Sequence, residues 1–229
     1  MVNVEMHCHL LPGVDDGARD VEEALELINE MKDLGVERIY LTPHLYSPKV
    51  PTDISKIKKA FSQFKEIVSN EVEILPGSEI YLVPGVSNRE LIPLGDTNFL
   101  LIELPTDIPP LYLWEEIDRL QRKGYVLILA HVERYGYFYK CSGLLSQLFR
   151  CKQPKKEFFD RLRQQGVLFQ VNWDILSPKT GKTPKHIRNL LEITFVDFTG
   201  SDKHRRNDSR QLIDFSTQLY KDLRNGELL

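Results

Sequence analysis

Short apolar runs alternate with amphipathic, helix-length segments about seven times along this chain. The clearest apolar runs are Val2–Leu10, Arg38–Thr42, Asn98–Leu104, Val126–Ala130 and Val167–Asn172. Continuous apolar strands that alternate with amphipathic helices predict a parallel sheet that is buried on both faces. Both an open, doubly wound sheet and a closed β/α barrel satisfy this pattern.

Weaker patterns complete the predicted α/β organisation. Further strands are predicted over Val72–Ile80 and Ile193–Thr199. Helices are predicted over Asp20–Met31, Ile54–Val68, Leu113–Arg122, Lys155–Gln165, Pro184–Leu191 and Asp208–Arg224. The chain has no phosphate-binding loop of the GxGxxG, GxxxxGKS or GxxxxGKT type, which removes the main support for a nucleotide-binding sheet. At 229 residues, a single domain over residues 1–229 is the expected organisation.

Charge and cysteine content narrow the class of protein. A net charge of -3 argues against a general binder of nucleic acid or anionic membranes. No apolar stretch has the length of a membrane span, and the N-terminus lacks the pattern of a signal peptide, so no direct membrane insertion is expected. The three cysteines, Cys8, Cys141 and Cys151, are too few and too scattered for a disulfide framework. A cytoplasmic location with reduced thiols is the expectation.

Two histidines, His7 and His9, stand one residue apart at the end of the first apolar run. In a strand, residues i and i+2 lie on the same face, so both imidazoles would point one way and Cys8 the other. That geometry suits a metal ion. The alternative is a pair of ordinary polar residues at a strand end, and further ligands elsewhere in the chain would decide between the two.

Further polar side chains stand at the carboxyl ends of nearly all the predicted strands. With the first pair they are His7, His9, His44, Glu79, Glu103, His131, Asp202 and His204. The carboxyl ends of barrel strands meet at one rim, where such folds place their chemistry. Five of the six histidines fall there, and only His186, inside a predicted helix, is interpreted as a surface residue. The strand that ends at Asn172 supplies no evident ligand.

Glu103 tests the metal hypothesis separately. A carboxylate inside an apolar run costs several kcal/mol to bury unless it is paired or binds a metal ion, and an ion pair with an arginine is the alternative. Imidazole mixed with carboxylate, without thiolate, suits Mn, Fe or Zn in a cluster. Eight or nine candidate ligands are too many for one ion, so the sequence predicts two or three ions with a bridging carboxylate.

Six motifs occur in the order HCHLLPGVDDGA, TPH, GSEI, LIELP, AHVERY and SDKH. With them the chain resembles the polymerase-and-histidinol-phosphatase (PHP) superfamily and, within it, the manganese-dependent protein tyrosine phosphatases of bacterial capsule and exopolysaccharide clusters. The resemblance runs from His7 to His204. It implies the superfamily's fold, a distorted (β/α)7 TIM-like barrel.

The resemblance also implies a trinuclear centre whose ligands can be named by position. One ion would be held by His7, His9, Glu79 and Asp202. A second would share Glu79 and take Glu103 and His131, and a third would take Asp16, His44 and His204. Asp16 is preferred to Asp15 only on this resemblance, since either aspartate also fits a simple turn before Gly17. Mn²⁺ is the implied ion, with Fe, Zn or Mg as alternatives.

The implied reaction is hydrolysis of a phosphate monoester, with phosphotyrosine as the natural group. A hydroxide that bridges two ions would attack phosphorus while the ions neutralise the phosphate oxygens. Arg134 is predicted to clamp a phosphate oxygen and Arg206 to assist. For Arg134 the alternative is an ion pair with Glu133 or another surface carboxylate. Arg205 and Arg206 follow His204 more closely than the family's arginines do, and Arg210 comes later. Which of these three arginines reaches the substrate therefore stays open.

No cysteinyl-phosphate intermediate is expected. A cysteine-dependent tyrosine phosphatase requires an arginine six positions after its nucleophile, and the positions after the three cysteines hold Val14, Gln147 and Glu157. The resemblance implies a phosphotyrosine protein as partner, namely the tyrosine-rich tail of a membrane-associated bacterial tyrosine kinase that controls polysaccharide export. Two alternatives stay open: a small-molecule phosphomonoesterase such as a histidinol phosphatase, and a non-catalytic metal-binding regulatory module.

Overall fold

A computed structural model describes residues 3–141, 152–176, 185–208 and 212. The strands are β1 (Val4–Cys8), β2 (Arg38–Leu41), β3 (His44–Leu45), β4 (Glu73–Pro76), β5 (Glu79–Tyr81), β6 (Phe99–Glu103), β7 (Val126–Leu129), β8 (Tyr139–Cys141), β9 (Lys152–Pro154), β10 (Leu168–Asn172) and β11 (Phe198–Gly200). The α-helices are α1 (Val21–Asp33), α2 (Ile54–Lys65), α3 (Leu113–Arg122), α5 (Lys156–Gln164), α6 (Trp173–Leu176) and α7 (Lys185–Ile193). Within these described ranges, three short 3-10 helices are η1 (Val86–Asn88), η2 (Val132–Arg134) and η3 (Gly136–Phe138).

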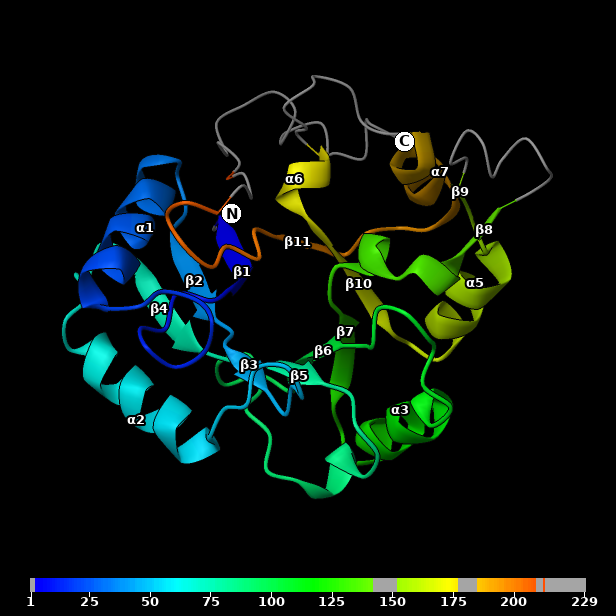
Figure 1. The fold of residues 1–229 in the computed structure, drawn as a ribbon, viewed down its shortest axis with the longest axis horizontal. Coiled ribbons are helices and arrows are strands. Elements are labelled where there is room, and N and C mark those ends of the chain that lie inside the picture. The colour runs from blue at the N-terminus through cyan, green and yellow to red at the C-terminus, as the bar shows by residue number, and fades with distance from the viewer. Residues whose placement is uncertain (1–2, 142–151, 177–184, 209–211, 213–229) are drawn as a thin grey trace.

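Most of the described strands form two parallel sheets. A six-stranded sheet has the order β11-β10-β7-β6-β5-β3, and a three-stranded sheet has the order β1-β2-β4. Every neighbouring pair in both sheets is parallel, whereas β8 and β9 form a separate antiparallel pair. Figure 1 shows α1, α2, α3, α5 and α7 around the outside of the strands. The α/β class and the parallel strands predicted from the sequence are confirmed.

The two parallel sheets meet at both of their edges. On one side β1 lies beside the segment that follows β11, where the amide of His9 donates to the carbonyl of Lys203 at 2.8 Å. On the other side β3 follows β2 and β5 follows β4, each after two residues, so the pairs β2–β4 and β3–β5 continue one another. The strands therefore curl round instead of lying in one flat layer.

Helix α1 shows how local sequence sets the boundaries of an element. The side chain of Asp20 accepts a hydrogen bond from the amide of Glu23 and so caps the first turn. The buried face of the helix includes Ala24, Leu27, Ile28 and Met31. Gly35, with φ 92°, takes the left-handed conformation just after the helix. The observed helix begins within one residue of the predicted start.

Two predicted strands are corrected by the structure. The strand expected over Val72–Ile80 is divided into β4, which pairs with β2, and β5, which pairs with β3 and β6. Gly77 lies between them, where a Cβ would come within 2.8 Å of the side chain of Leu94. The strand expected over Ile193–Thr199 begins only at Phe198, since Ile193 is the last residue of α7 and residues 194–197 connect this helix to β11. Almost all of the helix predicted over Asp208–Arg224 lies outside the described residues.

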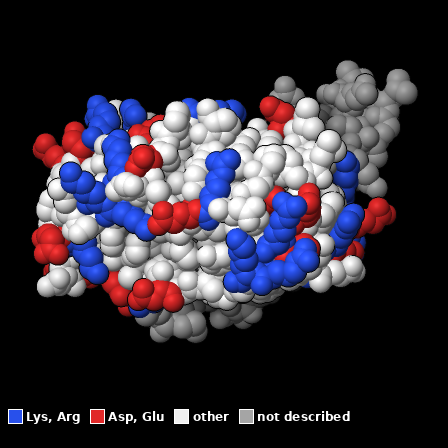
Figure 2. All heavy atoms as spheres, turned by 90° about the horizontal axis from the view of Figure 1, so that it is seen from below, with Lys and Arg blue, Asp and Glu red and all other residues white. Residues whose placement is uncertain are grey.

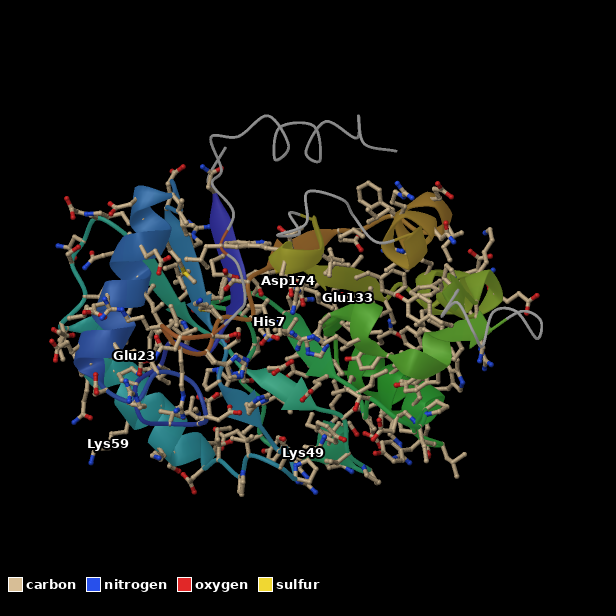
Figure 3. The ribbon with its side chains drawn as sticks, turned by 45° about the horizontal axis from the view of Figure 1, so that its top comes forward. His7, Glu23, Lys49, Lys59, Glu133 and Asp174 are labelled. Carbon is tan, nitrogen blue, oxygen red and sulfur yellow. The ribbon has the colours of Figure 1, made fainter. Side chains whose placement is uncertain are left out.

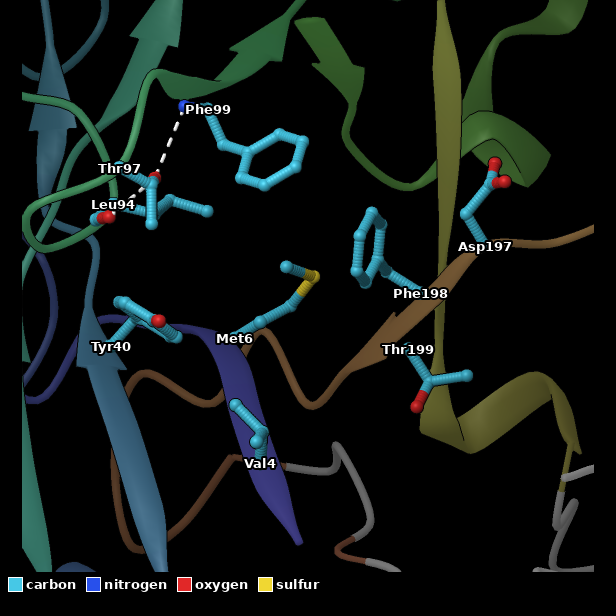
Figure 4. A pocket seen from close by; sticks show the side chains of 9 residues that line it. All are labelled: Val4, Met6, Tyr40, Leu94, Thr97, Phe99, Asp197, Phe198 and Thr199. Carbon is cyan, nitrogen blue, oxygen red and sulfur yellow. Dashed lines mark hydrogen bonds between the residues drawn. The ribbon is translucent and has the colours of Figure 1, made fainter. Parts of the chain in front are cut away.

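The space inside the curled strands is filled by side chains at its middle and hollow at one end. The inner apolar layer consists of Met6, Leu94, Leu101, Ile128 and Ala130. A cavity of about 310 Å³ is lined by Val4, Met6, Tyr40, Leu94, Thr97, Phe99, Asp197, Phe198 and Thr199 (Figure 4). Val4, Phe99 and Phe198 are the first residues of their strands, so this cavity lies at the amino ends of the strands.

Among the described residues, no helix combines the length and the apolar character that crossing a membrane requires.

Candidate metal centre

Strand β1, which contains His7 and is followed by His9 one residue after its end, has one extra residue relative to its partner β2. β1 and β2 pair regularly at Val4 and Glu5, and the register then shifts before Cys8, which marks a β-bulge. Met6 belongs to the inner apolar layer, whereas His7 and His9 lie together with their Nε2 atoms 3.3 Å apart. The two imidazoles therefore share a face. Figure 3 shows His7 near the middle of the strands.

Glu79, the first residue of β5, lies at the centre of a cluster of imidazoles. Its Oε1 is 3.4 Å from Nε2 of His7 and 2.8 Å from Nε2 of His131. Its Oε2 is 3.3 Å from Nε2 of His9 and 2.9 Å from Nδ1 of His44. One buried carboxylate thus contacts four imidazoles, two at the end of β1, one on β3 and one just after β7.

Asp202 approaches the same imidazoles from the segment after β11. Its Oδ1 lies 3.5 Å from Nε2 of His7, 3.4 Å from Nε2 of His9 and 3.5 Å from Nδ1 of His204. The backbone of Asp202 has φ 52°, and that of His131 has φ 33°. Residues other than glycine rarely adopt this region, and such strain collects at functional sites.

Asp16, His44 and His204 form the outer part of the cluster. Oδ1 of Asp16 is 3.6 Å from Nε2 of His44 and 3.5 Å from Nε2 of His204. The ring of His204 stacks on that of His9, with centroids 3.9 Å apart. Glu103, at the end of β6, places its Oε2 3.8 Å from Nδ1 of His44. All nine residues predicted as metal ligands therefore lie in one connected cluster.

The grouping inside the cluster differs in part from the predicted division among three ions. Three sets of ligand atoms each lie within 4.8 Å of one another: His9, Asp16, His44 and His204; His7, His9 and Glu79; and His44, Glu79 and Glu103. His9 adjoins the outer set, and His44 instead of His131 stands with Glu103. The cluster offers several neighbouring positions for a cation.

Burial and charge set the protonation of the carboxylates. Burial, followed by the negative charge of Glu79, raises the pKa of Glu103 to about 9. Burial acts in the same direction on Asp202, but the charge of His7 and a hydrogen bond from His9 hold the pKa of Asp202 well below its ordinary value. Carboxylates crowded in this way favour additional positive charge among them.

Of the two arginines predicted to contact phosphate, Arg134 lies at the cluster. Its Nη1 is 2.5 Å from Oδ2 of Asp202. Its side chain is buried for about two-thirds of its surface, with 35% exposed. Arg134 is thus anchored to a residue of the cluster and reachable from solvent.

The structure places Arg206 elsewhere. Its guanidinium pairs with Glu26 of α1 at 2.9 Å, and 69% of its side chain is exposed. Arg205 instead reaches the loop that carries Asp16: its Nε donates to the carbonyls of Asp16 at 3.0 Å and Gly17 at 3.2 Å.

Sequence reasoning did not predict a layer of buried polar residues behind the cluster, although it considered one of them, Asp15, as an alternative ligand to Asp16. These residues are Glu5, Asp15, Gln170 and Asn172. Oδ2 of Asp15 is 2.7 Å from Nδ1 of His9 and accepts from the amide of His44 at 2.9 Å. The available signal was the position of Glu5, Gln170 and Asn172 inside apolar strands, where a buried polar group needs a partner.

Cys8 points away from the imidazoles on either side of it. Its Sγ lies 3.4 Å from the carbonyl of Tyr40, and burial raises the pKa of its thiol well above the ordinary value. A buried, protonated thiol offers no nucleophile to the cluster.

The sequence of this chain is similar to one protein family and to several proteins of that kind. The family described as capsular polysaccharide synthesis, CpsB/CapC, matches residues 3–221. Tyrosine-protein phosphatase YwqE of Bacillus subtilis is 29% identical over 209 residues, covering 88% of this chain and 77% of that protein. The putative tyrosine-protein phosphatase CapC of Staphylococcus aureus is 27% identical over 244 aligned positions, covering 99% of this chain and 90% of that protein.

The chain also resembles a solved structure over nearly its whole length. That structure belongs to a report on YwqE from Bacillus subtilis and CpsB from Streptococcus pneumoniae, described as unique metal-dependent tyrosine phosphatases. The TM-score is 0.75 at 26% identity, and the match covers 99% of this chain and 93% of the other. With a family match from residue 3 to residue 221, the chain belongs to the CpsB/CapC family of capsular polysaccharide synthesis.

Proposed function

We propose that this chain is a metal-dependent protein tyrosine phosphatase. The observation that carries the proposal is the single cluster in which imidazoles and carboxylates from residues 7 to 204 meet around Glu79. The relatives named above are tyrosine-protein phosphatases, and the similar solved structure is described as metal-dependent. The reaction supported by these features is hydrolysis of phosphotyrosine without a cysteinyl-phosphate intermediate.

The chemistry of the cluster fits divalent cations. Nδ1 of His44, Oε2 of Glu79 and Nδ1 of His131 are buried, yet none makes a hydrogen bond of acceptable geometry with a described residue. Buried polar atoms without such partners cost free energy unless another group satisfies them. A cation that accepts nitrogen and oxygen lone pairs would do so, and imidazole mixed with carboxylate suits Mn, Fe or Zn.

We assign all nine predicted residues as ligands of two or three divalent ions, with Mn²⁺ as the preferred ion. They are His7, His9, Asp16, His44, Glu79, Glu103, His131, Asp202 and His204. Bound ions would supply positive charge for the phosphate oxygens and lower the pKa of water, so that hydroxide forms near neutral pH. The side chains themselves hold the lone pairs of the cluster in fixed positions, because most of them are buried.

Arg134 supplies the chain's own contact to the phosphate group. A guanidinium carries five N–H donors in a planar fork, and the contact with Asp202 leaves others free to donate to a phosphate oxygen. Anchoring by Asp202 also reduces the freedom that the side chain would lose on binding. The assisting role of Arg206 stays a sequence-based prediction, and its pairing with Glu26 gives that role no support.

We also propose that the strands close into a distorted, seven-membered barrel that forms a single domain over residues 1–229. β2 with β3, and β4 with β5, then each count as one bent strand. The order around the barrel is β1, β2/β3, β4/β5, β6, β7, β10 and β11. The parallel bridge between Cys8 and Lys203 brings the last position back beside the first, which supports closure.

The proposed substrate is a phosphotyrosine protein, namely the tail of a bacterial tyrosine kinase that regulates capsule or exopolysaccharide synthesis in the cytoplasm. Membership of a capsular polysaccharide synthesis family and the names of the relatives support this choice. No nucleic-acid partner and no membrane insertion are part of the proposal.

The test is phosphate release from a phosphotyrosine peptide and from histidinol phosphate. The protein is stripped of metal and resupplied with Mn²⁺. We expect restored activity that prefers the peptide and falls to background in His44→Ala and His131→Ala. Lys59→Ala, an exposed residue of α2 that Figure 3 labels away from the cluster, is the matched control and retains full activity.

Other outcomes would replace the proposal. Activity on histidinol phosphate alone would assign the same centre to a small metabolite. Silence on both substrates, with Mn²⁺ still bound, would identify a non-catalytic metal-binding module.

A further inference from the structure

The strand that supplies no predicted ligand, β10, is connected by hydrogen bonds to three residues of the cluster. Gln170 and Asn172 lie two positions apart on β10, and both are fully buried. Oε1 of Gln170 is 2.9 Å from the amide nitrogen of His131 and 3.1 Å from Nδ1 of His7. Nε2 of Gln170 donates to Oδ1 of Asn172 at 3.0 Å, and Nδ2 of Asn172 donates to Oδ2 of Asp202 at 3.2 Å.

The hydrogen bonds that run from His131 and His7 through Gln170 and Asn172 to Asp202 form one connected series, called the relay below. The groups at its two ends determine how the side-chain amides of Gln170 and Asn172 are oriented. The amide of His131 can only donate, so the atom of Gln170 that faces it is the oxygen. The same oxygen then accepts from His7, which places the hydrogen of the neutral ring on Nδ1. At the other end the carboxylate of Asp202 accepts, so Asn172 turns its NH₂ towards Asp202 and its oxygen towards Gln170. Every donor in the relay meets an acceptor.

The relay turns one atom of His7 and one atom of Asp202 towards the other residues of the cluster. Nε2 of His7 faces Glu79 at 3.4 Å and His9 at 3.3 Å. It carries no hydrogen when the neutral ring is protonated on Nδ1. Oδ2 of Asp202 is occupied by Asn172 and Arg134, so Oδ1 is the oxygen turned towards the imidazoles. A ligating imidazole commonly donates from its rear nitrogen to an acceptor that holds its tautomer and ring plane.

We propose that Gln170 and Asn172 are positioning residues for the metal centre. Gln170 keeps His7 in the tautomer with hydrogen on Nδ1, and Asn172 directs Oδ1 of Asp202 into the cluster. Neither residue touches the substrate or the reacting atoms. This inference rests on the proposed metal-dependent function, and it predicts a measurable state of the metal-free protein as well.

The experiment compares the full chain with Gln170→Leu, Gln170→Glu and Val171→Ala. Leucine removes both the acceptor and the donor at similar volume, whereas glutamate keeps an acceptor oxygen for His7. Val171 lies between the two relay residues on β10 and packs in the outer core, so Val171→Ala disturbs the strand without touching the relay. Mn²⁺ affinity is measured by titration calorimetry on stripped protein, and the protonated ring nitrogen of His7 by NMR of metal-free protein labelled with ¹⁵N-histidine. The His7 signal is assigned with His7→Gln.

We expect Gln170→Leu to bind Mn²⁺ about tenfold to a hundredfold more weakly and to lose the protonated Nδ1 signal of His7. Gln170→Glu restores that signal. Val171→Ala unfolds at a lower temperature than the unchanged protein but keeps both its Mn²⁺ affinity and the signal. A purely structural role for Gln170 would instead make the leucine and Val171→Ala variants alike.

Two results would overturn the inference. One is a Gln170→Leu variant that binds Mn²⁺ as tightly as the unchanged protein. The other is an unchanged protein whose His7 carries its hydrogen on Nε2 in the metal-free state. If the unchanged protein binds no Mn²⁺, the proposed function fails, while the NMR signal still decides the tautomer. If Gln170→Leu does not fold, the inference is decided by the His7 NMR signal of the unchanged protein and of Gln170→Glu.

Discussion

Asp15 and Asp16 are adjacent in the sequence, but their side chains meet the cluster in different ways. The side chain of Asp15 is fully buried and contacts Nδ1 of His9 and the amide of His44. Asp16 is half-exposed and turns Oδ1 towards His44 and His204. Both aspartates fit a turn before Gly17, so only a family resemblance could choose between them from the sequence. The direction of a side chain in a loop depends on contacts with distant strands.

This difference in burial predicts that alanine at position 15 mainly lowers stability, whereas alanine at position 16 mainly lowers activity. Asp15→Ala should lower the free energy of unfolding by about 1–3 kcal/mol, because it leaves a buried imidazole nitrogen without its partner. Asp16→Ala should change it by less than about 0.5 kcal/mol, since that side chain is half-exposed, yet still abolish Mn²⁺-dependent phosphate release. Urea unfolding in chelator and a phosphatase assay measure the two effects. Equal unfolding free energies for the two variants would contradict the assignment.

The arginines give a second prediction at the same scale. Arg134→Lys keeps the charge but loses the planar fork, so kcat/KM for a phosphotyrosine peptide should fall about tenfold to a hundredfold, as expected for a charged hydrogen bond of about 1.5–3 kcal/mol. Arg206→Ala should change kcat/KM little, because its guanidinium pairs with Glu26 at the surface. Steady-state kinetics of both variants provide the measurement. A comparable loss in Arg206→Ala would restore the role predicted for it from the sequence.

Elements whose boundaries depend on neighbouring residues were predicted well, and those shaped by distant contacts were not. The N-terminal caps of α1 and α2, Asp20 and Asp53, each accept from an amide three residues later, which is a local pattern. The bulge in β1 is a shift of its register against β2, and Gly77 lies against Leu41, Thr42 and Leu94, so both features involve residues that are distant in the sequence. No periodicity in the sequence reports such contacts.

The junction of β1 and β11 gives a prediction at the scale of elements. A Cβ on Gly200 would lie 2.6 Å from Cβ of His7 and 3.2 Å from Oε1 of Glu5, so Gly200→Ala must push the two strands apart. We expect a loss of about 1–3 kcal/mol in the free energy of unfolding, together with weaker Mn²⁺ binding, because His7 moves. Gly136→Ala is the control, since a Cβ there meets nothing within 4 Å. Urea unfolding and Mn²⁺ titration test both variants. If Gly200→Ala has the unfolding free energy and the Mn²⁺ affinity of the unchanged protein, the contact between β1 and β11 accommodates the extra methyl group and the prediction is wrong.

At the scale of the whole molecule, parallel topology explains why the rim could be predicted and the layer behind it could not. Parallel strands joined by helices place all their carboxyl ends on one side, so polar residues at those ends must converge. Glu5 and Gln170 stand inside apolar runs, and pattern alone gives no partner for either. Their partners, Ser201 and His7, lie 196 and 163 residues away in the chain.

A centre that joins the first strand to the last should stabilise the whole fold when occupied. At a free Mn²⁺ concentration one hundred times its dissociation constant, the free energy of unfolding should rise by about 2.7 kcal/mol for one site that the unfolded chain does not share. Urea unfolding in chelator and in Mn²⁺ measures this difference. In His131→Ala the difference should shrink, and a protein that unfolds identically in both conditions would refute metal binding at the cluster.

The pairing of β1 with the segment after β11 also affects when the cluster can form during synthesis of the chain. On a ribosome that adds about 5–20 residues per second, roughly 10–40 s pass between the synthesis of His7 and that of His204. Throughout that interval His7 and His9 exist without Asp202, and Glu5 exists without the amide of Ser201 that it will bind. The cluster is therefore assembled only after nearly the whole chain has been made, and a growing chain offers stray metal ions at most a fragment of it.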